Sequence, residues 1–253
     1  MFSGIIETRG EIVATYNKHN GRVLNIAYKK NPSEKELPVT NIPVTNVPIT
    51  NIPVTKKPAS ATKNYSNASH HKEAITSTTS PPHNKRAIAI TKIGASIAIN
   101  GVCTTVTEFD PTTFTCFVSN QTLEITNLKT LKKGTIVNLE SSLTYGAKVD
   151  GHLIYGHIDD TIALKNKIDL KDTWILQFAI KPKHNRYLIL KGPVALNGIS
   201  LTIYNITCDL LEVMIIPHTY FHTNLQFLTE NEEVNIEFDT LPKYIEKLLP
   251  QQT

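Results

Sequence analysis

The chain has 253 residues and a formal net charge of +4, and 40% of its residues are hydrophobic while 19% are charged. This balance is ordinary for globular proteins, so the chain has room for one large domain or two small ones. The small basic excess does not predict nucleic-acid binding, and no apolar run reaches the ~18 residues of a membrane helix. Three cysteines without a CxxC pair predict neither a disulfide framework nor a zinc ribbon. Charged residues near the N-terminus argue against a signal peptide, so we expect a cytoplasmic location.

Short alternating or β-branched runs recur along the chain and predict strands. In chain order they are 11–15, 22–28, 96–99, 102–109, 113–119, 135–139, 174–180, 193–196, 199–206, 211–216 and 233–238. Turn signals such as Asn-Gly and Asp-Pro separate them, and many short strands at this spacing predict small barrels or sandwiches. Residues 242–250 predict a short final helix with one apolar face and Pro242 near its start.

Residues 31–85 differ in composition from the rest of the chain. They hold eight of the fourteen prolines and no glycine, and a five-residue repeat places prolines at 38, 43, 48, 53 and 58. A proline at every fifth position blocks both a helix and a central strand. We therefore predict a low-complexity, disordered insertion within the first half, tolerated at the surface, with a partner-binding linker as the alternative.

The chain also contains an internal duplication. Three pairs of blocks match at one offset of 97 residues, namely 97–106 with 194–203, 118–128 with 215–225, and 137–140 with 234–237. FSGIIE at 2–7 matches IYGHID at 154–159 at an offset of 152. The two offsets differ by 55 residues, the length of 31–85, so two equivalent units are present and the insertion belongs to the first.

The repeated NGxxxT motif predicts one local structure in both units. Asn-Gly is typical of a type I′ hairpin, because glycine tolerates positive φ. After it, Cys103 and Thr105 in the first unit and Ser200 and Thr202 in the second alternate at period two, so each pair is expected on one sheet face. Such a pair can line a polar pocket, and an ordinary surface row of small polar side chains is the alternative.

These blocks, in their order and spacing, resemble the α-type riboflavin synthases. The resemblance is carried by MFSGIIE, NGVCTTV, QTLEITNL, VNLE, DGHLIYGHID, KGPVALNGISLTI, IPHTYFHTNL and VNIE, and it covers essentially everything outside 31–85. It implies an all-β fold of two tandem six-stranded antiparallel Greek-key barrels with a short C-terminal helix. It divides the chain into a first lumazine-binding barrel at 1–151, a second at 152–239 and a trimerisation helix at 240–253.

The resemblance also implies a reaction. Family enzymes dismutate two molecules of 6,7-dimethyl-8-ribityllumazine into riboflavin and 5-amino-6-ribitylaminouracil, the last step of riboflavin biosynthesis, and use no metal or cofactor. They are homotrimers whose active site forms between the first barrel of one subunit and the second barrel of a neighbour; further assembly with a lumazine synthase is left open. The alternative is a non-catalytic lumazine- or flavin-binding protein with the same fold. Retention of Cys103, His157, Ser200 and Thr202 favours the enzyme.

Residue roles follow from the same resemblance. His157 matches the family's active-site histidine, and imidazole suits proton transfer near neutral pH. Cys103 and Ser200 match residues beside the bound rings, as hydrogen-bonding groups or transient nucleophiles, and Thr202 and Ser96 complete the catalytic set. The expected substrate contacts are Gly4, Ile5, Ile6, Cys103, Thr104, Thr105, Ser119, Asn120, Gln121, Thr122, Gly156, His157, Ile158, Lys191, Ser200, Leu201, Thr202, Met214, Ile215, Ile216, Pro217, His218 and Thr219.

The sequence departs from the family pattern at several positions. These are Thr104 for leucine, Gln121 for glutamate, Ser141 for arginine, Asp150 for glycine and Tyr155 for serine. Thr104 is expected to point to the opposite sheet face from Cys103, and so to affect the core more than the chemistry. We expect Cys116 and Cys208 to be small core residues, and His152 to have a structural role.

Overall fold

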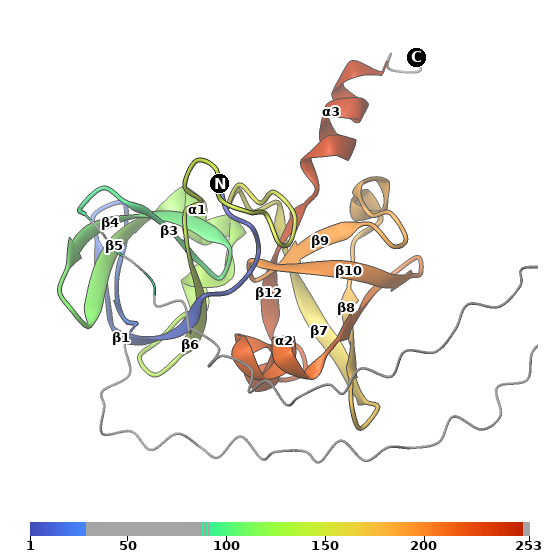
Figure 1. Ribbon diagram of the computed structural model, residues 1–253, viewed down its shortest axis with the longest axis horizontal. Helices are drawn as coiled ribbons and strands as arrows, with labels where there is room; N and C mark the ends of the chain where they lie inside the picture. Colours follow the sequence, from blue (N-terminus) through green and yellow to red (C-terminus); the bar gives the residue numbers. More distant parts are fainter. Residues whose placement is uncertain (29–87, 89, 91, 250–253) are drawn as a thin grey trace, which may run out of the picture. The chain divides into compact units, whose positions relative to one another are not determined.

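Two closed six-stranded barrels make up most of the computed structural model, which describes residues 1–28, 88, 90 and 92–249 (Figure 1). The first barrel contains β1 (Thr8–Lys18), β2 (Gly21–Ala27), β3 (Ser96–Ile99), β4 (Val102–Phe109), β5 (Thr113–Ser119) and β6 (Ile136–Ser141). The second contains β7 (Asp160–Asp169), β8 (Trp174–Ala179), β9 (Pro193–Leu196), β10 (Ile199–Ile206), β11 (Leu210–Ile215) and β12 (Glu233–Phe238). The all-β double barrel expected from the sequence is confirmed. The predicted insertion, 31–85, lies outside the described residues.

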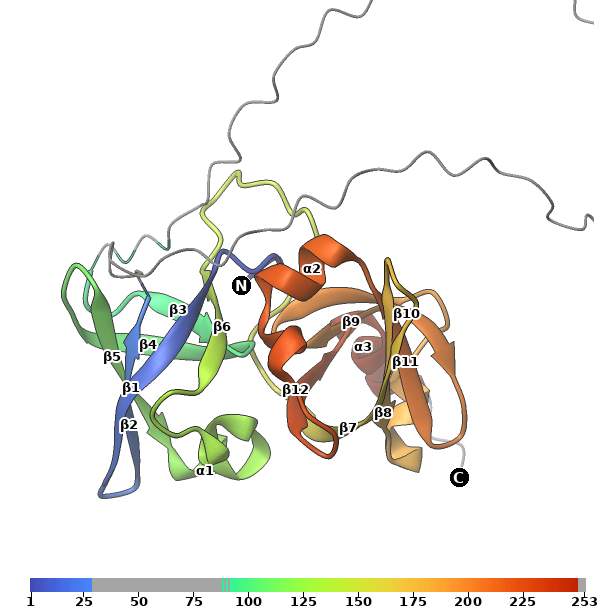
Figure 2. The same cartoon turned by 90° about the horizontal axis from the view of Figure 1, so that it is seen from below.

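Short helices occupy equivalent places in the two repeats. After β5 come α1 (Asn120–Ile125) and the 3₁₀ turn η1 (Asn127–Thr130), and after β11 come α2 (Pro217–His222) and η3 (Asn224–Phe227) (Figure 2). A further 3₁₀ turn, η2 (Pro182–Tyr187), follows β8, and α3 (Thr240–Leu248) follows β12. Among the described residues, no helix has the length and apolar character to cross a membrane.

Strand order is the same in both barrels. Around each barrel, a two-stranded hairpin is followed by a three-stranded meander and then by the last strand, which closes the barrel. The order of neighbours is β1-β2-β5-β4-β3-β6 in the first barrel and β7-β8-β11-β10-β9-β12 in the second. The predicted hairpins are confirmed, because both residues of Asn100-Gly101 (φ 47° and 78°) and of Asn197-Gly198 (φ 45° and 77°) are left-handed. The local pattern did not predict β7, because its register shifts between Leu164 and Asn166 and interrupts the alternation.

The segments that precede β1 and β7 exchange between the barrels. We call residues 2–6 the first arm and residues 154–158 the second arm. The arms pair with each other, since Phe2 N donates to Ile154 O (2.7 Å) and Ile154 N donates to Phe2 O (3.0 Å). Ile158 then joins the core of the first barrel, while Ile6 packs against the core of the second. Each repeat therefore contributes a side chain to the barrel of the other.

Buried asparagines bind the two barrels together. Six of them occupy equivalent positions in the two repeats and are almost inaccessible: Asn100, Asn127, Asn138, Asn197, Asn224 and Asn235. Asn235 Nδ2 donates to Asn100 O (2.8 Å) and to Asn127 Oδ1 (2.9 Å), and Asn235 Oδ1 accepts from Asn127 N (2.7 Å). The equivalent bonds recur 97 residues away. Buried amides that pair with one another in this way favour a single register between the barrels.

Two hairpin glycines allow this network to close. A Cβ placed on Gly101 would lie 2.6 Å from the backbone nitrogen of Gly198, and one placed on Gly198 would lie 2.7 Å from the backbone nitrogen of Gly101. Any larger residue would force the two hairpins apart. Glycine at these positions therefore allows both the positive φ of each turn and the close contact between the two hairpins.

We predict that Asn235→Ala lowers the free energy of unfolding by at least about 2 kcal/mol, because it leaves buried partners on Asn100 and Asn127 unpaired. Urea denaturation measures the change. The control is Asn205→Ala, an exposed asparagine on β10, which should change the free energy by less than about 0.5 kcal/mol. Equal effects of the two variants would contradict a stabilising role for the network.

Candidate functional site

The predicted thiol and hydroxyl pairs lie on the outer faces of the barrels. Cys103 is partly buried and Thr105 is exposed, whereas Thr104 between them is enclosed and its hydroxyl donates to Ile97 O (3.0 Å). In β3, Ser96 pairs with Thr105, which places both on the same outer face. The expected orientations on β4 are confirmed.

The second barrel carries the equivalent outer face. Ser200 is partly buried and Thr202 is exposed, and they pair with Ala195 and Pro193 of β9. Leu201 between them belongs to the barrel core. Each repeat therefore presents a small polar pair beside its Asn-Gly hairpin, as the duplicated motif predicted.

A glycine of each arm contacts the key residue of the opposite barrel. Ser200 N donates to Gly4 O (2.9 Å), and Cys103 N donates to Gly156 O (3.0 Å). Both glycines have positive φ, 76° and 78°. A Cβ on either would lie 2.6 Å from the Cβ of its partner, Ser200 or Cys103. The predicted substrate-binding segments around Gly4 and Gly156 are thus brought to the predicted catalytic side chains, each from the other repeat.

Two buried glutamates hold the arms in place. The Glu140 carboxylate accepts from Ser3 N (2.7 Å), Ser3 Oγ (2.7 Å) and Gly4 N (3.1 Å), and Glu237 accepts from Tyr155 N (2.7 Å) and Gly156 N (2.9 Å). Burial raises the pKa of both carboxyl groups, and these hydrogen bonds lower it in part. Sequence reasoning found these residues as the ends of VNLE and VNIE but gave them no role. The match between these two segments at the 97-residue offset was the signal that could have identified them.

The second-barrel face contains an imidazole that the sequence did not assign to it. His152 Nδ1 lies 2.7 Å from Ser200 Oγ. The ring is half-buried, and burial lowers the pKa of His152, which the charge of Asp239 partly offsets. His157, the predicted proton-transfer residue, is exposed and follows Gly156, so it lies next to the Cys103 face. Its ring stacks with that of Tyr155 at 6.2 Å.

The remaining predicted contacts fall into two groups. The accessible group extends the two faces: Ile5, Ser119, Asn120, Gln121, Thr122, Lys191, Met214, Ile216, Pro217, His218 and Thr219. In this group Ser119 caps α1, with its Oγ accepting from Thr122 N (3.3 Å), and the Lys191 ammonium lies 5.0 Å from the Tyr204 ring.

The second group is enclosed in barrel cores. The side chains of Thr104, Ile158, Leu201 and Ile215 are all buried, and that of Ile6 packs against the second core. Substrate contact at these positions stays a prediction of the sequence, and with the side chains turned inward it would be made by backbone atoms. Cys116 is buried as expected, and burial raises its pKa to about 12, whereas the core assignment of Cys208 is wrong, since this residue is exposed in the β10–β11 turn.

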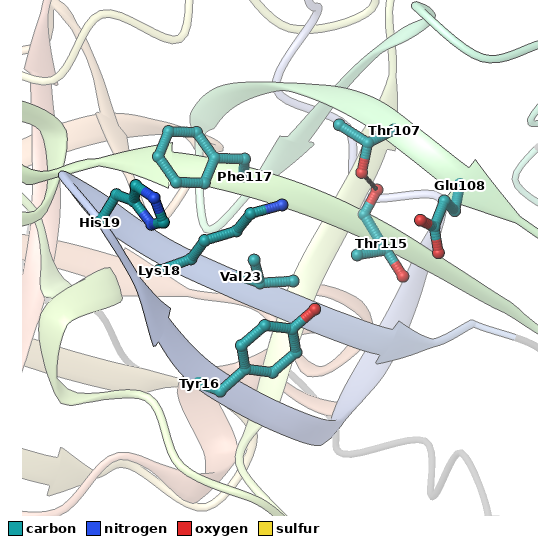
Figure 3. A pocket seen from close by; sticks show the side chains of 8 residues that line it. All are labelled: Tyr16, Lys18, His19, Val23, Thr107, Glu108, Thr115 and Phe117. Carbon is teal, nitrogen blue, oxygen red and sulfur yellow. Dashed lines mark hydrogen bonds between the residues drawn. The ribbon is translucent and has the colours of Figure 1, made fainter.

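A hollow of about 360 Å³ lies on the outer face of β1, β2, β4 and β5 (Figure 3). Its lining residues are Tyr16, Lys18, His19, Val23, Thr107, Glu108, Thr115 and Phe117. None of the predicted site residues lines it, so it is separate from the Cys103 position. Within the described part of the chain, no three His, Cys, Asp or Glu side chains are placed to bind a metal ion.

We predict that raising the pH from below about 4.5 to neutrality destabilises the wild-type chain relative to Glu237→Gln. The folded pKa of Glu237 is raised above the ordinary value of 4.5, so its protonated form is favoured by folding. That contribution is present below the unfolded pKa and is lost as the pH rises through the folded pKa. Glutamine does not ionise and lacks this dependence. Urea unfolding across this range measures the difference, and a constant difference would contradict the assignment.

Comparisons with known proteins agree with this geometry. A family model described as the lumazine binding domain matches residues 3–142 and 155–239. The riboflavin synthase of Bacillus subtilis (strain 168) is 36% identical over 157 residues, 62% of this chain and 73% of that protein. The riboflavin synthase of Schizosaccharomyces pombe is 35% identical over 159 residues, 62% of this chain and 76% of that protein.

Solved structures share the fold. A crystal structure of LumP complexed with riboflavin superposes with a TM-score of 0.68 at 17% identity, covering 94% of this chain and 100% of that chain. A complex of LumP with 6,7-dimethyl-8-(1'-D-ribityl) lumazine superposes with a TM-score of 0.65 at 16% identity, covering 94% and 99%. At this identity the likeness concerns the fold. The family-model match and the identity to the two riboflavin synthases go further: the chain belongs to the lumazine-binding family of the riboflavin synthases.

Proposed function

We propose that the protein is a riboflavin synthase, a transferase that converts two molecules of 6,7-dimethyl-8-ribityllumazine into riboflavin and 5-amino-6-ribitylaminouracil. The observation that carries the proposal is the pair of repeat-related faces, one with Cys103 against Gly156 and one with Ser200 against Gly4. A reaction between two copies of one molecule needs two sites that recognise the same ring system. The duplicated barrels supply two such faces.

Each face offers groups suited to a neutral, ring-shaped ligand. The arm glycines bring backbone close to the ligand position, and the side chains of Thr105 and Thr202 are exposed beside it. Cys103 and Ser200 supply a thiol and a hydroxyl as hydrogen-bonding or transient nucleophilic groups. Ser96 lies beside Thr105 on the outer face of the first barrel. Lys191 extends the second-barrel face.

The reaction needs a proton removed from the 7-methyl group of one bound lumazine, followed by carbon–carbon bond formation. We assign proton transfer at the first-barrel face to His157, whose exposed imidazole follows the arm glycine there. Holding two lumazines in contact replaces a bimolecular encounter by a positioned one, which lowers the barrier by up to roughly 7–11 kcal/mol in ideal geometry.

The last helix supports a homotrimer. Leu241, Tyr244, Ile245 and Leu248 of α3 recur at helical spacing and are all about half or more exposed. Hydrogen bonds hold the opposite, polar side of the helix: Arg186 donates to Glu246, and Lys243 donates to Asp159. A short helix with an uncovered apolar stripe is poorly stable alone. We propose that neighbouring subunits cover it, and that residues 240–253 are the trimerisation segment after barrels at 1–151 and 152–239.

A second candidate is a non-catalytic lumazine- or flavin-binding protein. It is supported by the fold likeness to LumP, which was crystallised with riboflavin and with the ribityl lumazine. The 36% identity to the riboflavin synthase of Bacillus subtilis favours the enzyme, because the likeness to LumP, at 17% identity, concerns the fold. A cytoplasmic location and assembly with a lumazine synthase stay predictions of the sequence.

We predict that the purified protein consumes two molecules of 6,7-dimethyl-8-ribityllumazine for each riboflavin formed, because both faces bind the same compound. Chromatography of the products over time measures this ratio. The matched negative control is Cys103→Ala/Ser200→Ala, which removes both key side chains. Ligand fluorescence that changes on binding, without any riboflavin, would instead establish the binding protein.

We predict that Leu241→Lys/Leu248→Lys converts trimers into monomers, because two charges interrupt the apolar stripe of α3. Light scattering coupled to gel filtration measures the mass. Lys247→Gln, a change of one exposed polar residue on the same helix, serves as the control and should leave trimers intact. Trimers in both variants would refute the role of this helix.

A further inference from the structure

The Ser200 hydroxyl is held in a close-fitting environment built by the residues before the second arm. His152 Nδ1 lies 2.7 Å from Ser200 Oγ, and His152 N donates to Ser3 O (3.2 Å). A Cβ placed on Gly151 would lie 2.8 Å from Ser200 Oγ and 2.2 Å from Ser3 O. Only glycine fits at 151, so the backbone brings the imidazole directly onto the hydroxyl.

The equivalent position in the first barrel lacks this partner. Cys103 shares the arm-glycine contact through Gly156, but among the described residues its thiol makes no side-chain hydrogen bond. The two repeat-related sites therefore differ chemically. One has a hydroxyl paired with an imidazole, and the other has a thiol beside the exposed His157.

We propose that His152 is a positioning residue of the second-barrel site, which holds the Ser200 hydroxyl through Nδ1 and takes the hydroxyl proton during turnover. This inference rests on the proposed function. This step is separate from the proton transfer that we assign to His157 at the first-barrel face. As Ser200 Oγ removes a methyl proton from the lumazine bound at the second-barrel face, the C–H bond breaks and a new O–H bond forms. The original hydroxyl proton passes to Nδ1, and the electron pair stays on the lumazine, delocalised into its ring. One proton leaves the substrate and one arrives on the imidazole.

The surroundings of His152 suit a proton acceptor. Burial lowers its pKa, which keeps the ring neutral near neutral pH. Asp239, which precedes α3, is the acidic group whose charge acts on His152 among the described residues, and it raises the pKa. Because the acceptor must be neutral, turnover is expected to fall as the pH drops through the pKa of His152.

The first experiment compares kcat and KM of His152→Ala, Ser200→Ala and the double variant. Each single variant should lower kcat about 100-fold, within the usual range for proton-transfer groups. The double variant should lose no more than the worse single one, because the two residues act as a unit. The control is His19→Asn, which removes an exposed imidazole at a hairpin position of positive φ (45°) that asparagine tolerates. Multiplicative losses, or kcat of His152→Ala within about 3-fold of wild type, would overturn the proposal.

A second variant separates proton transfer from a structural role. The amide of His152→Asn reaches about the position of Nδ1, so it keeps the hydrogen bond to Ser200 but takes no proton. It should retain lumazine affinity and thermal stability while kcat stays about 100-fold low and the acidic limb of the pH profile disappears. Restored kcat would overturn proton transfer.

The pH profile gives a third, independent measurement. Asp239→Asn keeps the helix cap, since asparagine also accepts from Leu241 N, but removes the charge that raises the pKa of His152. The acidic limb of kcat should therefore move to lower pH, and a limb that stays in place or moves up would overturn the assignment.

Nuclear magnetic resonance tests the pair without turnover. Ser200→Ala should shift the titration of the His152 ring, and an unchanged titration would overturn the pair. If the wild-type protein bound lumazine but formed no riboflavin, the proposed function and the proton transfer during turnover would both fail. This titration would then decide whether the hydrogen-bonded pair itself exists.

Discussion

The six-asparagine contact between the barrels is the constraint on which the rest of the structure depends. Hydrogen bonds between these amides cross the repeat boundary in both directions, as from Asn127 Nδ2 to Asn197 Oδ1 (3.0 Å) and from Asn224 Nδ2 to Asn100 Oδ1 (3.1 Å). If either barrel shifts, these hydrogen bonds break, and each polar group left unpaired in the buried interface costs free energy. The contact therefore selects one relative placement of two otherwise self-contained barrels.

That placement explains why the arms exchange. With the hairpins of Gly101 and Gly198 in contact, the chain entering each barrel passes over the outer face of the other. The buried glutamates then bind the arm backbone, and the arm glycines reach Ser200 and Cys103. Neither site is complete within one repeat. This interdependence gives the duplication a functional reason, because a single barrel would lack the arm that completes its own face.

The two faces have diverged within this shared frame. Serine and cysteine occupy the same position of the β-hairpin, but among the described residues only the serine has an imidazole within hydrogen-bonding distance. Two of the departures from the family pattern are accommodated by hydrogen bonds. Thr104 satisfies its hydroxyl on Ile97 O inside the barrel, and Ser141 donates to Glu7 (2.9 Å) near the start of β1. Tyr155 stacks on His157 and so changes the surface around the proposed proton-transfer group of the first barrel.

The sequence by itself determined the duplication, every strand except β7, the Asn-Gly turns and the outward direction of Cys103 and Ser200. These features follow from the order of residues along the chain, because the 97-residue offset, the period of two and the Asn-Gly turns can all be recognised in the sequence. Only the tertiary structure showed the asparagine network, the roles of Glu140 and Glu237, and the contact of His152 with Ser200. Those interactions join residues from 27 to more than 130 positions apart. No pattern of neighbouring residues encodes them, because they depend on how the two barrels and their arms meet.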